Sequence, residues 1–211
     1  MIYDISRTIS TRIAVWPGDH PFQFHHNLEL QKGDSVNLTT MTLSPHTGTH
    51  ADAYYHYQSD AAHPADMPLH AFIGPATVVH VTKTDGPLYP DDFATYDLDN
   101  AERLLIRSPV SSLPDDIWPE QFPYLSIELV AWLAERNIVL IGLDSPSVDA
   151  LESTDLPCHH ALYQHGMVNL ESLCLKDVPD GTYELIALPL KLDQVCGSPV
   201  RAILRALPAG R

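Results

Sequence analysis

Positive charge is scarce in this sequence. It holds 12 Lys and Arg against 27 Asp and Glu, which gives a formal net charge of −15 at pH 7 with histidine neutral. A field of this sign repels the phosphates of nucleic acids and of anionic lipid headgroups. We therefore expect no nucleic-acid partner and no membrane partner.

Long apolar runs are absent as well. No stretch approaches the ~18 consecutive apolar residues that a membrane-spanning helix needs. The opening residues, MIYDISRTIS, lack the apolar core of a signal peptide. These two absences lead us to expect a cytoplasmic protein.

Cysteine is sparse. Cys158, Cys174 and Cys196 are an odd number and include no CxxC pair, so neither a disulfide framework nor a thiolate zinc site is indicated. We expect three reduced, buried thiols. Cys158 stands next to His159, but no independent base or oxyanion arrangement can be read around it, so we expect a packing residue and not a nucleophile.

Internal repeats, charge blocks and low-complexity linkers are also missing, and the 18 prolines are spread along the chain. A chain of 211 residues, 45% of them apolar, is long enough for one domain that buries roughly 70% of the surface exposed on unfolding. We expect a single domain spanning residues 1–211.

Secondary structure is predicted from runs of β-branched and aliphatic residues and from one helix signature. The runs predict strands at 76–82, 104–108, 138–143, 183–188 and 200–204. A helix is predicted between the second and third of these, with Ser126 as N-cap, Asn137 after its end, and an apolar face of Ile127, Val130, Ala131 and Ala134. The order strand, helix, strand allows a parallel crossover, and the Pro and Gly turns elsewhere favour antiparallel pairs. The expected fold class is α/β, with a mixed, partly antiparallel sheet and a few helices.

Histidine, in contrast, is abundant, and its positions are clustered. Within eleven residues the chain carries His46, His50, Asp52 and His56. A straight strand would spread these side chains over about 33 Å, and a continuous helix would point the two i,i+4 pairs to different sides. The chain must therefore bend, and Gly48 is the natural position.

A bend at Gly48 would let His46, His50 and Asp52 converge on a divalent cation. Two imidazoles and a carboxylate suit zinc, and manganese or iron as alternatives. His56 would then stand one step away, free for proton transfer. A single histidine is more often a surface residue or a hydrogen-bonded core residue, but four ligand-type residues at this spacing favour a metal site.

Three ligands leave the coordination of the ion incomplete, so further ligands are expected from another part of the chain. The candidates are His159, His160 and Glu171.

The run from 46 to 56 fits the pattern HxGxHxDxxxH at every fixed position, and here the sequence resembles the cyclase-type metal-dependent hydrolase family and, within it, the bacterial kynurenine formamidases (arylformamidases). The resemblance extends to residues 16–19 (WPGD), 142–149 (GLDSPSVD) and 197–202 (GSPVRA). One departure is Tyr54, where members usually have proline, so the turn that aims His56 is expected to differ in shape.

The resemblance implies the rest of the site. The family spaces a histidine twelve residues before a glutamate, which matches His159 with Glu171 and leaves His160 one short. The family also implies two divalent ions, zinc by preference, and a homodimer. Trp16 is assigned to the substrate pocket by resemblance; in sequence terms it lies before a Pro-Gly pair typical of a type II turn, and core packing remains an equal alternative.

The implied reaction is hydrolysis of N-formyl-L-kynurenine, a small aryl formamide, to L-kynurenine and formate in tryptophan degradation. Metal-activated water would be the nucleophile, and His56 would carry a proton to the departing nitrogen. Two alternatives stay open: isatin-type opening of a cyclic aryl amide, and a metal-binding module without catalysis. Asp144 and Arg201 lie in family-like segments, but a salt bridge or a turn explains each of them as well.

Overall fold

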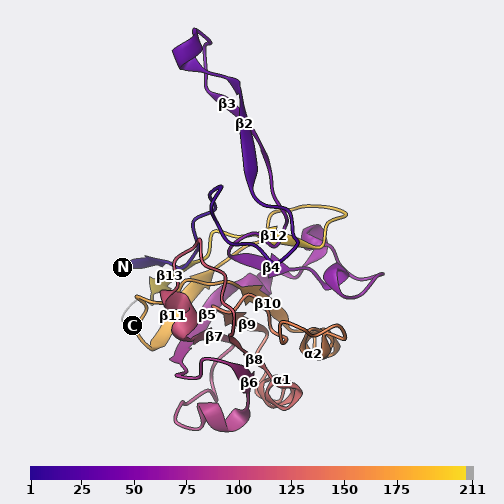
Figure 1. Cartoon of the computed structure of the whole chain (residues 1–211). Coiled ribbons are helices and arrows are strands. Elements are labelled where there is room, and N and C mark those ends of the chain that lie inside the picture. The colour runs from indigo at the N-terminus through magenta and orange to yellow at the C-terminus, as the bar shows by residue number, and fades with distance from the viewer. Residues whose placement is uncertain (208–211) are drawn as a thin grey trace.

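A nine-stranded mixed sheet forms the centre of the molecule in the computed structural model, which describes residues 1–207 (Figure 1). Its strands lie in the order β1-β13-β11-β5-β7-β9-β10-β4-β12. Their bounds are β1 Ile2–Asp4, β4 His50–Asp52, β5 Ile73–His80, β7 Arg103–Arg107, β9 Leu140–Leu143, β10 Val168–Glu171, β11 Gly181–Ile186, β12 Gly197–Pro199 and β13 Ile203–Ala206. The pairs β5–β7, β7–β9 and β9–β10 are parallel, and the other pairs in this sheet are antiparallel. The predicted α/β fold class is confirmed.

Both faces of the sheet are covered by buried apolar side chains. Along β7, Leu105 belongs to one core, whereas Leu104 and Ile106 belong to the other, as expected for a strand whose side chains alternate between faces. The second core also contains Leu129 of α1 (Ile127–Ala134) and Leu162 of α2 (Pro157–Gln164). The two α-helices of the described chain therefore pack on one face of the sheet.

Helix α1 begins where the sequence predicts, because the Ser126 hydroxyl accepts a hydrogen bond from the Leu129 N–H at 3.0 Å. The helix ends before Asn137, which has a φ of +60°. The predicted apolar face is partly wrong: Ile127 is 53% exposed, and Leu129, Val130 and Leu133 are the buried residues.

The remaining elements are short. A parallel pair joins β6 (Gly86–Leu88) to β8 (Pro123–Leu125). Six 3₁₀ helices are present in the described residues: η1 Leu30–Lys32, η2 Tyr54–His56, η3 Pro64–Asp66, η4 Leu69–Phe72, η5 Pro90–Phe93 and η6 Pro109–Ser112. None of the helices within residues 1–207 is long and apolar enough to cross a membrane.

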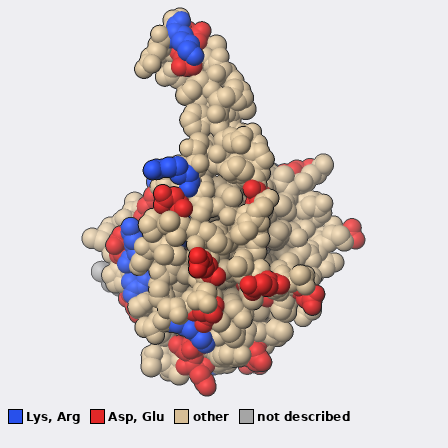
Figure 2. Space-filling view, viewed as in Figure 1, with Lys and Arg blue, Asp and Glu red and all other residues tan. Residues whose placement is uncertain are grey.

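A two-stranded arm projects away from the body of the molecule (Figure 1). It consists of β2 (Gln23–Leu28), η1 at the tip and β3 (Leu38–Thr42), paired antiparallel with Phe24 opposite Met41. Every residue of both strands is exposed. Neither strand contains Lys, Arg, Asp or Glu, and Figure 2 shows the shaft of the arm without charged residues and its tip with both signs of charge.

Candidate metal centre

The His-rich run bends at Gly48, as the sequence predicts. Gly48 has a φ of +66°, a conformation that side chains with a Cβ rarely adopt, and a Cβ there would lie 3.0 Å from Ile13 Cδ1. After the bend, residues 50–52 form β4, and η2 then turns the chain so that His56 lies beside His46, with ring centroids 4.2 Å apart.

The sheet register brings sequence-distant residues to this run. In the β4–β10 pair His50 lies opposite Glu171, and in the β4–β12 pair Asp52 lies opposite Gly197. Helix α2 begins beside the same strands and carries His159. The sheet and one helix thus gather His46, His50, Asp52, His56, His159 and Glu171 at one place.

Asp52 lies at the centre of two donor sets. Its Oδ1 is 3.0 Å from His46 Nδ1 and 3.4 Å from His50 Nε2, and its Oδ2 is 3.2 Å from His159 Nε2. His159 Nε2 is also 3.5 Å from Glu171 Oε1. Two triads follow, one of His46, His50 and Asp52 and one of Asp52, His159 and Glu171, each with donor atoms within 4.8 Å of one another.

Each of these three imidazoles has its second nitrogen beside another acceptor. His50 Nδ1 lies 2.9 Å from the Gly48 carbonyl, and His159 Nδ1 lies 2.7 Å from Asp149 Oδ2. His46 Nε2 lies 3.2 Å from Cys196 Sγ. An outer acceptor of this kind fixes the ring orientation and leaves the inner nitrogen available to a cation.

The donors fit a divalent cation. Within the described residues His50 Nε2 and Asp52 Oδ1 are buried and have no hydrogen-bond partner. Polar atoms that are buried without partners cost about 1–3 kcal/mol each. Nitrogen and carboxylate donors in such a set are the ligands that zinc and related ions take, so a cation would satisfy the atoms that the protein itself does not.

The cluster also stabilises positive charge. Burial lowers the pKa of His46 and of His50, but the adjacent Asp52 carboxylate outweighs burial and raises the pKa values to about 10 and about 9. Burial raises the pKa of Asp52, but the hydrogen bond to His159 and the adjacent imidazoles of His46 and His50 outweigh it, so the pKa lies well below its ordinary value. Protons and a cation therefore compete for one site, and metal affinity should rise with pH.

A pocket of about 410 Å³ opens on the cluster. Its lining includes His46, His56, Trp16 and Trp118, and the two indoles meet edge to face with centroids 5.5 Å apart. Trp16 precedes a tight turn, closed by a 2.9 Å bond from the Asp19 N–H to the Trp16 carbonyl, with a φ of +91° at Gly18. This is the predicted type II turn, and Trp16, at 36% exposure, lies at the pocket and not in the core.

The Cyclase family model matches residues 3–150. The chain belongs to the Cyclase family.

Relatives of this Cyclase-family chain cover nearly its whole length. A kynurenine formamidase of Salinibacter ruber is 44% identical over 208 residues, which are 98% of each chain. A solved structure described as a potential metal-dependent hydrolase with cyclase activity has a TM-score of 0.83 at 26% identity, covering 97% of this chain and 96% of the other. Isatin hydrolase A from Labrenzia aggregata shares the fold, with a TM-score of 0.82 at 24% identity and coverage of 97% and 93%.

Sequence reasoning missed three residues of the site in this Cyclase-family chain. Asp149 holds His159, and Asn169 donates hydrogen bonds from Nδ2 to Asp52 at 2.8 Å and to Glu171 at 3.1 Å. The expectation of three buried thiols is wrong for Cys174 and Cys196, which are half-buried, and Cys196 lines the pocket. Asp149 ends the 142–149 segment and Cys196 directly precedes the 197–202 segment, so proximity to these segments was the available signal.

The remaining candidate residues lie outside the donor cluster. The buried thiol of Cys158 donates to the Leu125 carbonyl at 3.2 Å, as expected of a packing residue. Asp144 accepts hydrogen bonds from Ser108 and Ser111, and Arg201 forms an exposed salt bridge with Asp4. His160 is half-buried and lies outside both triads.

Proposed function

We propose that this Cyclase-family chain is an enzyme that hydrolyses N-formyl-L-kynurenine to L-kynurenine and formate. One observation carries the proposal: the likeness to a kynurenine formamidase extends over 98% of both chains at 44% identity. The donor cluster at the base of an aromatic-lined pocket is the kind of site that such a hydrolysis needs.

We propose that His46, His50 and Asp52 hold one divalent ion and that Asp52, His159 and Glu171 hold a second. The support is that the two carboxylate oxygens of Asp52 face different donor sets. Mixed imidazole and carboxylate donors favour zinc, with manganese and iron as alternatives.

His56 is the proposed proton carrier. It lies at the pocket, is exposed, and belongs to neither of the two triads that contain Asp52. When bound, a divalent cation supplies Lewis acidity, which activates water and polarises an amide carbonyl. In the proposed reaction water adds its oxygen to the formyl carbon and gives a proton to His56, the C–N bond breaks, and His56 transfers that proton to the departing nitrogen.

Trp16 is the proposed aryl-binding residue. Its indole and that of Trp118 line the pocket next to the imidazoles, and a flat ring can stack on either of them. A pocket of about 410 Å³ is large enough for a small aryl amide. A purely structural metal site would instead be closed by protein ligands and would leave no such space.

We also propose that the enzyme is a homodimer and that the arm formed by β2, η1 and β3 contacts the second copy. The arm exposes Phe24, Leu38 and Met41, the last at 65%. An isolated two-stranded hairpin is marginally stable in water, and exposed strand edges are normally protected by charges. The strands of this arm carry none, so a permanent partner is the simplest reason for the arm to persist.

The proposed compartment is the cytoplasm. Cys158, Cys174 and Cys196 are all free in the structure. Free thiols persist where glutathione and thioredoxin keep them reduced, and this favours an intracellular enzyme.

The test is a direct assay with two substrates. The purified protein is incubated with N-formyl-L-kynurenine and, separately, with isatin, while kynurenine absorbance, formate and ring-opened isatin are measured. We expect equimolar kynurenine and formate and little isatin opening. Preferential opening of isatin would replace the proposed reaction by that of the cyclic-amide hydrolases.

A further inference from the structure

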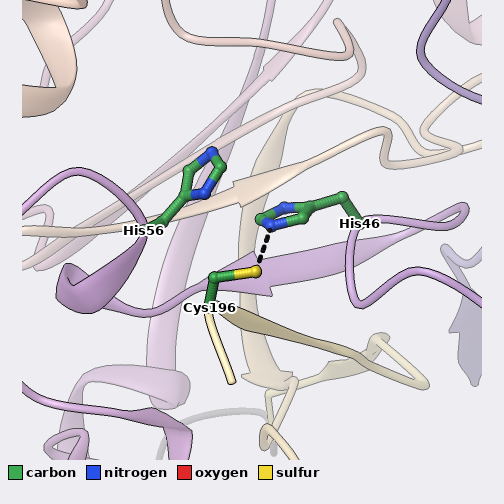
Figure 3. A group of neighbouring side chains, drawn as sticks. All are labelled: His46, His56 and Cys196. Carbon is green, nitrogen blue, oxygen red and sulfur yellow. Dashed lines mark hydrogen bonds between the residues drawn. The ribbon is translucent and has the colours of Figure 1, made fainter. Parts of the chain in front are cut away.

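A third set of donor atoms lies on the outer side of the candidate metal centre. Cys196 Sγ is 3.2 Å from His46 Nε2, and together with a ring nitrogen of His56 these atoms lie within 4.8 Å of one another (Figure 3). The three side chains come from separate parts of the chain: the loop before β4, the end of η2, and the residue before β12. All three line the pocket and can be reached from solvent.

The set is distinct from the inner triads because of the orientation of His46. The two nitrogens of this ring point in different directions, Nδ1 toward Asp52 at 3.0 Å and Nε2 toward Cys196 at 3.2 Å. A flat imidazole cannot present both nitrogens to one ion. An ion bound beside Cys196 is therefore different from an ion bound beside Asp52.

The chemistry of the outer set is also different. The inner triads offer nitrogen and carboxylate oxygen, whereas the outer set offers two nitrogens and one sulfur. A thiolate selects softer cations than a carboxylate does. Nitrogen and sulfur ligands of a tetrahedral zinc ion lie about 3.5 Å apart, which is close to the 3.2 Å between His46 Nε2 and Cys196 Sγ.

We propose that Cys196, His46 and His56 form a separate cation site. It binds thiophilic divalent ions such as cadmium or excess zinc and thereby inhibits the enzyme. This regulation rests on the proposed hydrolysis, although binding itself does not. A cation at this site occupies the lone pair of His56 that would otherwise carry the proton. It also competes for His46, because a neutral imidazole has one lone pair to offer.

The binding test uses cadmium added to the metal-loaded protein. Wild-type protein should develop the ultraviolet charge-transfer absorbance of a cadmium–thiolate bond. Cys196→Ser and Cys196→Ala should not, and circular dichroism of both variants establishes that they are folded. Cys174→Ser is the matched control, since Cys174 is also half-buried but lies outside the pocket lining and the three donor sets; it should keep the absorbance.

The inhibition test measures kynurenine release against cadmium concentration, each variant relative to its own rate without cadmium. The half-inhibitory concentration should rise by at least about tenfold in the two Cys196 variants and stay unchanged in Cys174→Ser. Removing even a residue that only hydrogen-bonds to a metal ligand lowers metal affinity by about tenfold or more. Absorbance that is absent from the wild type, or that survives in Cys196→Ser, overturns the site. Equal inhibition of all variants overturns its regulatory role. Absorbance without turnover of the formamide by any variant leaves the site intact and overturns the proposed function instead.

Discussion

At the scale of single residues, the roles proposed for Asp52 and His56 rest on their different surroundings. Asp52 is buried and faces three imidazoles with its two oxygens. His56 is exposed at the pocket and, in the described chain, forms no salt bridge with the carboxylates of the site. This difference in surroundings predicts different consequences of removing each side chain.

His56→Ala should keep its bound metal and lose about 10²- to 10⁴-fold in turnover, the range for loss of a general acid or base. Asp52→Ala should lose both metal and turnover, since it removes a donor from both triads. Metal content by mass spectrometry and kynurenine release check the pair, with His160→Ala as a control outside the triads. Equal metal loss in His56→Ala and Asp52→Ala would contradict this division.

The same residues show how far sequence reasoning reaches. Spacing within eleven residues was enough to predict a bend at Gly48 and the convergence of His46, His50 and Asp52, because short-range geometry limits what such a segment can do. His159 and Glu171 needed the family resemblance in addition. Asp149, Asn169 and Cys196 were missed because their side chains act through contacts between distant segments, which local spacing does not encode.

At the scale of elements, the bend before β4 sets the position of the inner donors. Gly48 has a positive φ and lies against Ile13, so an added Cβ meets both backbone strain and a close contact. The bend therefore couples local conformation to the pairing of β4 with β10 and β12.

Gly48→Ala should destabilise the fold by about 1–2 kcal/mol from the left-handed backbone alone, and the contact with Ile13 should also displace the donors and weaken metal binding. Gly166→Ala is a matched control, since Gly166 has the same φ of +66° but open space around it. Urea unfolding and metal titration should show a stability loss in both variants and an affinity loss in Gly48→Ala alone. An unchanged affinity in Gly48→Ala would show that the bend does not position the donors.

The strands were predicted unevenly, and their length explains why. The apolar runs found β5, β7, β9, β11 and β13, with ends displaced by up to three residues. β4 and β12 have three residues each. β4 consists of His50, Ala51 and Asp52, a composition that sequence analysis assigns to a ligand-bearing loop and not to a strand. Such strands exist because their neighbours pair with them, which is tertiary information.

At the scale of the whole molecule, the arm is the feature that a monomer explains least. A chain with a net charge of −15 keeps both strands of its most exposed element free of charge. Two acidic copies can approach each other more easily at uncharged surfaces, because like charges at an interface repel.

The double variant Phe24→Asp with Met41→Asp places two charges on paired positions of the arm. It should shift the protein from dimer to monomer in sedimentation velocity, since the contact would then bury charges of equal sign. Gln31→Asp, at the charged tip, should leave the dimer unchanged. A wild-type protein that sediments as a monomer at micromolar concentration would contradict the proposed role of the arm.

Hydrolysis by this chain should depend on metal held by the cluster around Asp52. The most direct measurement strips the metal with a chelator, restores zinc in steps, and follows bound zinc, kynurenine and formate at each step. We expect no turnover without metal. Release of both products should rise in proportion to bound zinc in the wild type and stay absent in Asp52→Ala. Full turnover by the metal-free protein would contradict it.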